Sequence, residues 1–465
     1  MSNIPGVRIT EVDSPGQGAA ATSGHVPLLL GCLLGYSGNP DEHVNAPLWI
    51  DSYQAFLARF MPFSRAIVLA SGWGEPIVEK GSDSNPGEES SLNPSPSAVE
   101  NDVTFGAVPV PENNQVVVLK SSDVATGAAG VKSYFDNGGS PCYVMHCDSE
   151  QQGAKIADSL QEYNDITLYV ALDDLAKVSM QTAFPLLQAI NPQAMLITHQ
   201  PYLGYVPPQP LPDNSQVAAY APALKFAAPG GELEEGSTLL AGTGKTLAQL
   251  KVSDDEKQRE QYANVTARRN TDQFDSSILR VITLAPSGGV AGAFCKTERE
   301  RGIWKAPANI QLTGPAPTHN LTPQQQAELT QAGFNPLLWS PRTGTVIAGG
   351  RTADTNDLNW RFISVRLLFN AVQRDLLAII QPLVFELNGP RSWQAATAGI
   401  RNYLYLLWKR GGLQGLTPEQ AFQVQVALGE DDEAQGVMRM RVALAPLRPA
   451  EFIELEFTQQ LQVLA

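Results

Sequence analysis

The segment 242–246, which reads GTGKT, is the most suggestive chemical motif in the chain because it has the ending of a phosphate-binding P-loop. Such a loop also needs a glycine five positions before Gly244, so that its backbone N–H groups can surround a phosphate, and Leu239 stands there. The preceding GGELEEGSTLL is short and acidic and does not resemble the strand that should lead into a P-loop. The sequence favours a flexible loop, and a P-loop-like nucleotide-binding enzyme remains the alternative.

Cys142, His146 and Cys147 are close enough in sequence to suggest metal ligands. Structural zinc sites commonly use two closely spaced ligand pairs, and no second Cys or His pair occurs in the chain. The segment CYVMHC is also typical of a buried strand with ordinary thiols. Four cysteines in 465 residues are too few for a disulfide framework. We therefore expect no metal and no cofactor.

Other catalytic signatures are weak. No serine stands in a GxSxG elbow, and the segment APSGGVAG at 285–292 lacks the GxGxxG order and reads as a turn. The acidic clusters 254–256 and 430–433 lack the spacing of a calcium-binding loop and resemble solvated turns. The sequence therefore predicts no catalytic residue.

The length and charge of the chain indicate several domains and exclude some kinds of binding partner. The chain is too long for one compact core, which predicts several domains. Its net charge of -15 argues against binding nucleic acid or anionic lipid. Charged residues make up 17% of the chain, below the usual share of about a quarter, which suggests extensive burial, including burial between subunits.

The apolar runs predict a protein that does not enter membranes. The longest runs, such as 26–34 and 376–385, are roughly half the length of about twenty residues that a bilayer span requires. The first residues, MSNIPGVRITEVDSPG, lack a basic stretch followed by an apolar one. From this we expect no secretory signal, and folding in the cytoplasm.

The middle of the chain alternates between strand-like and helix-like patterns, which predicts a mixed α/β domain. Turn-forming residues separate these elements, as in the cluster YFDNGGSP. The expected strands are 26–36, 115–120, 142–146, 166–172 and 194–198, and the expected helices lie near 130–135, 151–163 and 178–189.

Two stretches interrupt this pattern. Residues 71–115 are rich in Ser, Pro, Gly, Asn and Glu and predict an exposed insertion. Residues 204–260 look irregular and suggest a second, variable insertion.

The two ends of the chain carry complementary signals. The segment VRITEV at 7–12 alternates and is bounded by Pro and Gly, so it predicts an extended arm that must pair with a sheet elsewhere or in another chain. Near the other end, a helix is expected over 359–383 and a second one after the Asn-Gly-Pro turn at 388–390. The second helix has an apolar stripe of Trp393, Ile400, Leu404 and Leu407.

Three alternating strands are expected after these helices, at 421–428, 437–444 and 451–458. Arginines 439 and 441 on one strand and glutamates 454 and 456 on another could pair across the sheet. The apolar faces consist of Met438, Met440, Val442 and Leu444 in the second strand and of Ile453, Leu455 and Phe457 in the third.

Several segments along the chain are more specific together than any one of them. The segments are PGVRITEV at 5–12, YFDNGGSPCYVMHC at 134–147, LAPSGGVAGAFCKTERERGIWKAPAN at 284–309, NWRFISVRLLFNAVQRDL, LVFELNGPRSWQ, GGLQGLTPEQAFQV and LAPLRPAEFIELEF. In their order and spacing they resemble the contractile tail sheath family of phage tails and of phage-tail-like extracellular injection particles of the antifeeding-prophage and virulence-cassette type.

The resemblance implies a structural subunit that polymerises helically, as stacked and usually sixfold rings, around an inner tube. It implies contraction from a metastable extended state without a nucleotide or a catalytic residue. Its expected partners are other copies of itself, the inner tube protein, baseplate and terminator or cap proteins, and paralogous sheath proteins. In such sheaths the two terminal arms complete a sheet with neighbouring subunits, which here points to Val7, Ile9, Val12, Met438, Met440, Val442, Ile453, Leu455 and Phe457.

The second C-terminal helix is our candidate for contact with the inner tube through charge, because it carries Arg391, Arg401, Lys409 and Arg410. An ordinary solvated helix face would show the same residues. A non-contractile capsid or baseplate component is a further alternative for the whole chain.

The resemblance also suggests how the chain is divided in a particle assembled in the cytoplasm and released outside the cell. Residues 1–339 carry 20 basic and 35 acidic residues, whereas 340–465 carry 12 of each. This charge partition suits a neutral inner part and an acidic outer part. We expect an arm at 1–25, an inner sheath domain from 26–70 and 340–465, an insertion at 71–115, and an outer α/β domain at 116–339.

Overall fold

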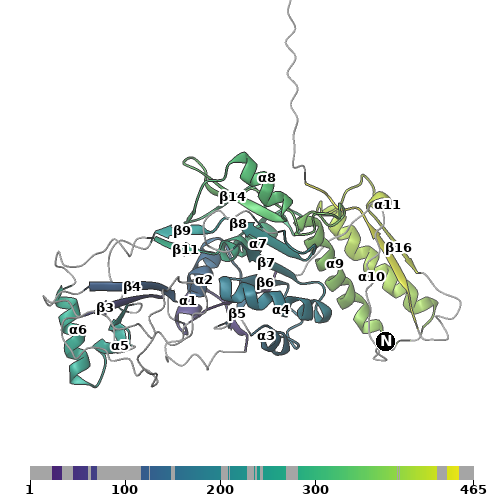
Figure 1. Ribbon diagram of the computed structural model, residues 1–465. Helices are drawn as coiled ribbons and strands as arrows, with labels where there is room; N and C mark the ends of the chain where they lie inside the picture. The colour runs from purple at the N-terminus through teal and green to yellow at the C-terminus, as the bar shows by residue number, and fades with distance from the viewer. Residues whose placement is uncertain are drawn as a thin grey trace, which may run out of the picture.

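The computed structural model of the chain has a large α/β body (Figure 1). A small sheet with the helices α5 and α6 lies on one side of this body, and a mainly helical module lies on the other. The structure describes residues 24–33, 46–60, 64–70, 117–124, 126–147, 152–200, 208, 210–227, 235, 238–240, 245–268, 281–384, 386, 388–426 and 437–449. The predicted arm at 7–12, the insertion at 71–115 and the strand at 451–458 lie outside these residues.

A nine-stranded mixed sheet forms the body, in the order β12-β15-β14-β8-β7-β6-β1-β5-β2. From β5 to β14 neighbouring strands are parallel, and the pairings at the two ends are antiparallel. The strands are β1 (Pro27–Gly31), β2 (Leu48–Ile50), β5 (Cys142–His146), β6 (Leu168–Ala171), β7 (Met195–His199), β8 (Val217–Ala221), β12 (Ile310–Leu312), β14 (Phe334–Ser340) and β15 (Gly344–Ile347).

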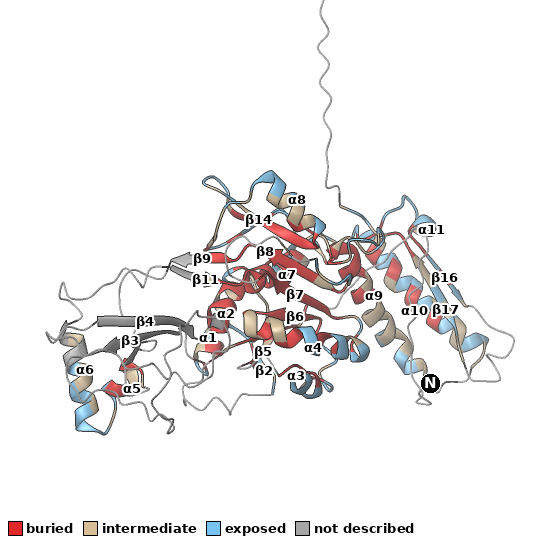
Figure 2. Ribbon diagram, in the orientation of Figure 1, coloured by how far each residue is buried: buried red, intermediate tan, exposed pale blue. Residues whose placement is uncertain are grey.

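Helices cover both faces of this sheet, which explains why its central strands are apolar on both sides (Figure 2). On one face, α2 (Thr126–Asp136) and α7 (Ser287–Arg301) contribute to the larger hydrophobic core. On the other face, α3 (Gly153–Ser159) and α4 (Asp174–Ile190) form a second core. The prediction of a mixed α/β fold is confirmed.

Glycines allow α7 to lie directly against α2. A Cβ at Gly288 would stand 2.3 Å from the carbonyl oxygen of Gly130, and one at Gly292 would stand 2.2 Å from that of Tyr134. The predicted turn at 285–292 is therefore wrong, because these glycines begin a helix whose first half is fully buried. Local pattern suggested a turn, but close helix packing gives the glycines a different role.

The remaining elements of the body and its small neighbour are short. One three-stranded sheet has the order β10-β3-β4 and a second has the order β11-β9-β13. The bounds are α1 (Tyr53–Leu57), β3 (Ser64–Ala70), β4 (Val117–Val124), β9 (Leu224–Ala227), β10 (Thr238–Leu240), α5 (Leu247–Lys251), α6 (Glu256–Arg268), β11 (Val281–Leu284), β13 (Ala316–Pro317) and α8 (Pro323–Gln331).

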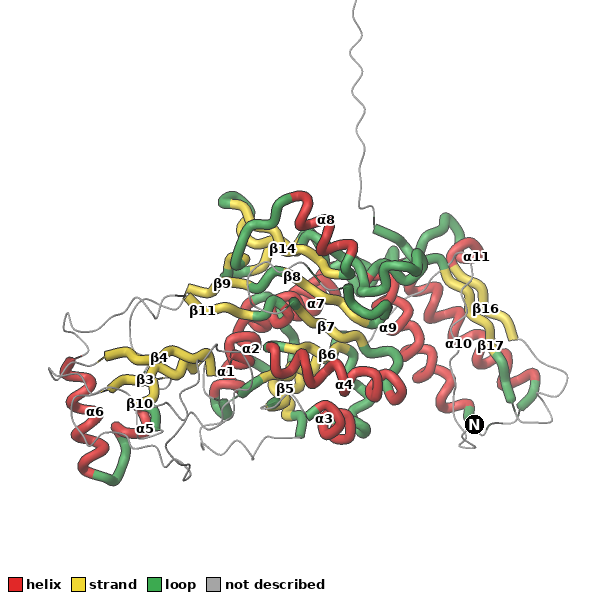
Figure 3. Tube along the Cα trace, viewed as in Figure 1, coloured by secondary structure: helices red, strands yellow, loops and turns green. Residues whose placement is uncertain are grey.

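The C-terminal module consists of two long helices and a hairpin (Figure 3). These are α9 (Ile363–Ile380), the short 3-10 helix η3 (Gln381–Leu383), α10 (Pro390–Lys409), α11 (Pro418–Ala421), and the antiparallel strands β16 (Phe422–Val426) and β17 (Met440–Leu444). Both predicted helices and the first two predicted strands are present. The stripe of α10 is also present, with Ile400, Leu404 and Leu407 buried and Trp393 half-buried.

A buried polar network fixes the first half of α9 to the body. The amides of Gln216 and Asn370 exchange two hydrogen bonds of 2.7 and 2.9 Å. Arg366 donates from Nε to Asn370 and lies with its guanidinium carbon 4.2 Å from the ring centre of Trp360. These contacts anchor the module where it leaves the sheet.

Residues 204–260 are not irregular throughout, as the sequence suggested. They include β8, which is an interior strand of the main sheet, along with β9, β10, α5 and part of α6. Short strands rich in Ala, such as VAAYA, give a weak local signal and are recognised only by their pairing. The inner and outer division of the chain remains a prediction, although β1 lies between strands of the segment assigned to the outer domain.

Candidate functional site

Doubly wound sheets usually bind ligands between the carboxyl ends of two neighbouring strands whose following helices lie on opposite faces of the sheet. In this sheet β1 and β6 are such a pair, because α2 lies on one face and α4 on the other. The buried carboxylate of Asp173 occupies this place. Its Oδ2 accepts from the backbone N–H of Cys32 at 2.6 Å, and its Oδ1 accepts from that of Ala176 at 2.9 Å, at the start of α4. Burial raises the pKa of Asp173 despite these bonds. A carboxylate in this position opposes the binding of phosphate.

A glycine lets α2 approach the carboxyl end of β1 closely. A Cβ at Gly127, at the start of α2, would lie 2.7 Å from the carbonyl oxygen of Cys32. The helix therefore approaches the end of β1 too closely to leave room for a ligand group between them.

His199, Ser287 and Asp174 have the residue types of a hydrolase triad and are in hydrogen-bonding distance. His199 Nδ1 lies 3.0 Å from Ser287 Oγ, and His199 Nε2 lies 3.2 Å from Asp174 Oδ1. However, both His199 and Ser287 are completely buried, so the hydroxyl does not meet solvent in this structure. The trio joins the end of β7 to the starts of α4 and α7, which is a structural role.

Cys142 and Cys147 lie in different hydrophobic cores, on opposite faces of the sheet. They therefore do not converge on one metal ion with His146. Burial raises the pKa of the Cys142 thiol, and the Cys147 thiol donates to Ser179 Oγ at 3.5 Å. The strand interpretation of CYVMHC is confirmed by β5.

The GTGKT segment is preceded by a strand after all, since β10 ends at Leu240. The prediction that no strand precedes this segment is therefore wrong, because an acidic approach and three apolar residues give only a weak strand signal. The two final residues of the motif nevertheless serve local structure. Lys245 Nζ donates to Gln258 Oε1 at 2.9 Å, and Thr246 caps the five-residue helix α5 in a reciprocal capping box with Gln249.

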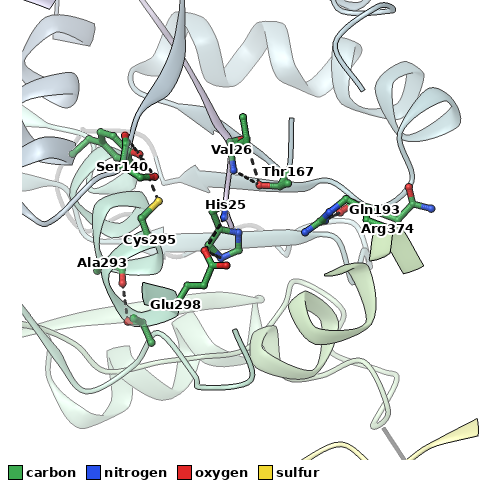
Figure 4. A network of polar contacts seen from close by, with 11 residues as sticks. His25, Val26, Ser140, Thr167, Gln193, Ala293, Cys295, Glu298 and Arg374 are labelled. Carbon is green, nitrogen blue, oxygen red and sulfur yellow. Dashed lines mark hydrogen bonds and ion pairs between the residues drawn. The ribbon is translucent and has the colours of Figure 1, made fainter. Parts of the chain in front are cut away.

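A group of charged side chains lies where the body meets α9 (Figure 4). Glu298 on α7 accepts from the backbone N–H of His25 at 2.7 Å, just before β1 begins. Arg374 on α9 donates from Nη1 to the carbonyl of Gln193 at 3.2 Å, and its Nε and Nη2 are buried without a hydrogen-bond partner. Burial raises the pKa of Glu298, and burial together with Arg374 lowers that of His25 to about 3.

The hairpin β16–β17 provides an incomplete sheet. Val424 faces Val442 and Val426 faces Met440, and this apolar side packs toward the core that includes α10. On the other side Gln425 faces the exposed Arg441. Among the described residues the sheet has only two strands, and a two-stranded sheet is marginal by itself. The three predicted exchange residues Met438, Met440 and Val442 are half-buried here.

The six other predicted exchange residues lie outside the described part of the chain, so their pairing stays a prediction. They are Val7, Ile9 and Val12 in the N-terminal arm and Ile453, Leu455 and Phe457 in the last strand. The predicted pairing of Arg439 and Arg441 with Glu454 and Glu456 is likewise untested, because both glutamates lie outside it.

The four predicted tube-contact residues are all exposed and are distributed along α10 and its C-terminal end. Arg391 lies in the first turn, whereas Lys409 and Arg410 end the helix. Arg401 reaches toward the hairpin and donates to the carbonyl of Val424 at 3.5 Å. No acidic residue occurs between 390 and 416, so every charged side chain of this segment is basic.

Comparison with known proteins identifies this module. Residues 355–460 match the family model of the phage tail sheath C-terminal domain. This range contains α9, α10 and the hairpin β16–β17. No curated protein matches the chain.

Solved structures extend the match to the whole chain. A protein in the baseplate of the anti-feeding prophage, determined with sixfold symmetry, is 26% identical, with a TM-score of 0.63 and coverage of 99% of this chain and 100% of its own. The contracted helical sheath of the same particle gives 27% identity, a TM-score of 0.62 and the same coverage. The chain is thus similar to contractile sheath structures over nearly its whole length, and its residues 355–460 match the sheath C-terminal domain family.

A more distant sheath shows the same fold. The contracted sheath complex of an extracellular contractile injection system, PVC, is 22% identical over 99% of this chain and 98% of its own, with a TM-score of 0.61. These matches to sheath structures support a structural role for this chain. None of its described helices is long and apolar enough to cross a membrane.

Proposed function

We propose that this chain polymerises helically, as stacked sixfold rings around an inner tube, and contracts from a metastable extended state to drive the tube through a target envelope. The observation that carries the proposal is the match over nearly the entire chain to a sheath and a baseplate component of one contractile particle. A polymer that stores free energy in its extended state needs no nucleotide, since relaxation to closer subunit packing supplies the work.

Strand exchange is the proposed link between subunits. The β16–β17 hairpin has one covered apolar face and only two strands in the described residues. Added strands from neighbouring arms would satisfy its open edges through backbone hydrogen bonds. Such links persist while rigid bodies rotate, which allows a tube to shorten without separating.

The particle context follows from the same proposal. The subunit assembles in the cytoplasm with tube, baseplate and cap proteins, alone or beside paralogous sheath proteins, and the finished particle is released outside the cell. Residues 26–70 and 340–465 then form the inner wall, and 116–339 with the insertions form the acidic outer wall.

Electron microscopy of the purified protein and of particles that contain it tests this function. We expect tubes of two lengths and diameters, with the shorter and wider tube appearing after a contraction stimulus. Particles that keep one length and one diameter under every stimulus would favour a non-contractile capsid or baseplate component.

The basic surface of α10 is proposed to face the inner tube. Charge reversal of Arg391, Arg401, Lys409 and Arg410 should abolish co-sedimentation of the sheath with tubes, because exposed charges act mainly through complementarity. Reversal of Lys132 and Arg299, which lie on the body, is the matched control. Unchanged co-sedimentation of the four-residue variant would show that α10 is an ordinary solvated helix face.

A further inference from the structure

The described chain ends at residue 449, beside the loop that precedes α9. Arg448 Nη2 donates to the side-chain oxygen of Asn359 at 3.1 Å. The last described residue therefore lies next to the segment 359–361, and residues 450–465, called the C-terminal tail below, continue from this point. Because an extended chain spans about 3.3–3.6 Å per residue, only the first few residues of the tail can contact the surface around 359–361.

A hollow of about 210 Å³ lies at this place, between the end of α8 and the loop 351–361. Arg361 lines the hollow, and no hydrogen bond or ion pair joins its guanidinium to another described residue. Asp354 also lines it, but Asp354 Oδ1 accepts from the backbone N–H groups of Asn356 and Asp357 at 3.2 and 3.0 Å. A guanidinium presents several N–H donors in one plane and pairs most strongly with a carboxylate, so the hollow suits one added carboxylate.

The backbone around Arg361 is firmly held. The Arg361 carbonyl accepts from the backbone N–H of Thr352 at 2.8 Å, and Thr352 Oγ1 donates to the carbonyl of Trp360 at 2.8 Å. Farther along the loop, the backbone N–H of Thr355 donates to Asp213 Oδ1 at 3.3 Å. Because the loop is already ordered, a carboxylate that binds Arg361 loses little free energy to ordering it.

Apolar surface lies beside the last described residue. Leu358 is 59% exposed and Leu447 is 36% exposed. Each is the sequence neighbour of one partner in the hydrogen bond between Asn359 and Arg448, so the two leucines lie near each other. One exposed leucine is ordinary, but two on joined segments form a surface that an aromatic ring can cover.

The first residues of the tail match this surface in chemistry. They read AEFI, so a carboxylate at Glu451 and an aromatic ring at Phe452 follow residue 449 by two and three positions. The whole tail contains three glutamates and no lysine or arginine. Covalent connection keeps the local concentration of Glu451 beside the hollow high, which favours it over the same residue of another copy.

We propose that the root of the C-terminal tail docks on its own subunit, with the Glu451 carboxylate in the hollow against Arg361. The Phe452 ring then covers Leu358 and Leu447. This docking sets the direction in which the rest of the tail leaves the subunit. It deepens the proposed strand exchange and rests on it only for the path of the tail beyond its root.

Crosslinking shows which copy supplies the carboxylate. Arg361→Cys with Glu451→Cys, treated with a short bis-maleimide, should give a crosslinked monomer on a denaturing gel. Arg361→Cys with Gln462→Cys is the matched control and should not, because position 462 lies eleven residues farther along the tail. The single-cysteine variants report any background from the four native cysteines. A crosslinked dimer, or no crosslink, in Arg361→Cys with Glu451→Cys would overturn the proposal.

Hydrogen exchange of the backbone amides of 450–453 measures the docking in the dispersed subunit. Arg361→Glu should raise the exchange rate about fivefold, which corresponds to the upper range for a partly exposed ion pair. Adding Glu451→Arg should restore the natural rate. Arg342→Glu, in the exposed turn between β14 and β15, is the matched control and should leave the rate unchanged. Equal urea midpoints for the two arginine variants show that both fold.

The outcomes separate this inference from the proposed function. An unchanged exchange rate in Arg361→Glu would refute the docking, whether or not the protein forms contractile tubes. A raised rate that Glu451→Arg does not restore would assign the hollow to another anion, such as inorganic phosphate, and would also refute it. Restored protection in a protein that forms no tubes would support the docking and contradict the proposed function.

Discussion

At the scale of residues, buried charge at the joint between body and C-terminal module makes stability depend on pH. Burial raises the pKa of Glu298 above its ordinary value of 4.5, so the folded state binds a proton more readily than the unfolded state. The stability that comes from this proton is complete below the ordinary pKa and is lost as the pH rises through the raised pKa. At neutral pH the buried, ionised Glu298 therefore lowers the stability of the folded state, and an uncharged side chain at this position would not.

We predict that Glu298→Gln becomes more stable relative to the natural protein as the pH rises from about 4.5. The glutamine amide oxygen can still accept from the His25 backbone, so the fold is kept. Chemical denaturation of the subunit at a series of pH values measures the difference. Glu300→Gln, on the exposed side of the same helix, should show no such trend, and parallel pH profiles for the natural protein and Glu298→Gln would contradict the prediction.

At the scale of elements, the contact between α2 and α7 depends on the absence of side chains. Gly292→Ala would place a Cβ 2.2 Å from the carbonyl oxygen of Tyr134, which is backbone and cannot move aside. We expect a loss of about 1–3 kcal/mol in the free energy of unfolding, as overpacked cores show. Thermal or urea denaturation measures it.

Gly350→Ala is the matched control for this prediction. A Cβ at Gly350 would meet the side chains of Ala308 and Ala306 at 3.4 and 3.7 Å, which is ordinary contact, so its effect should be small. Equal stabilities for the two variants would mean that α7 can shift away from α2 without cost.

At the scale of the whole molecule, polymerisation is predicted to depend on a single face of the N-terminal arm. Val7→Asp with Ile9→Asp should abolish polymers, because alternate residues of an added strand face the same side and would bury charge. Removal of residues 1–15 should do the same and leave a soluble subunit. Electron microscopy and sedimentation measure both.

Substitutions on the other face of the arm test whether a strand is involved. Arg8→Ser with Thr10→Ser should leave polymers intact, since these positions alternate with Val7 and Ile9. Normal polymers from Val7→Asp with Ile9→Asp, or from the truncated chain, would contradict the proposal that exchanged strands link neighbouring subunits.

The spacing of apolar residues and the positions of turn-forming residues made much of this protein predictable from its sequence. Strong apolar runs such as 142–146 and 195–199 became strands close to the expected positions, and the Gly-Pro pair at 389–390 begins α10 as expected. The basic, acid-free character of α10 was also visible, since it depends only on composition. These features are local, so neighbouring residues are enough to specify them.

Long-range contacts decided the rest. The glycines of 288–292 look like a turn until α2 lies against them, and VAAYA becomes an interior strand only because β7 and β14 pair with it. His199, Ser287 and Asp174 meet although up to 113 residues separate them in the chain, and burial then makes them structural. Sequence by itself determined the periodic elements and the charge of α10. Tertiary structure decided which polar groups are enclosed, because burial depends on segments that meet only after folding.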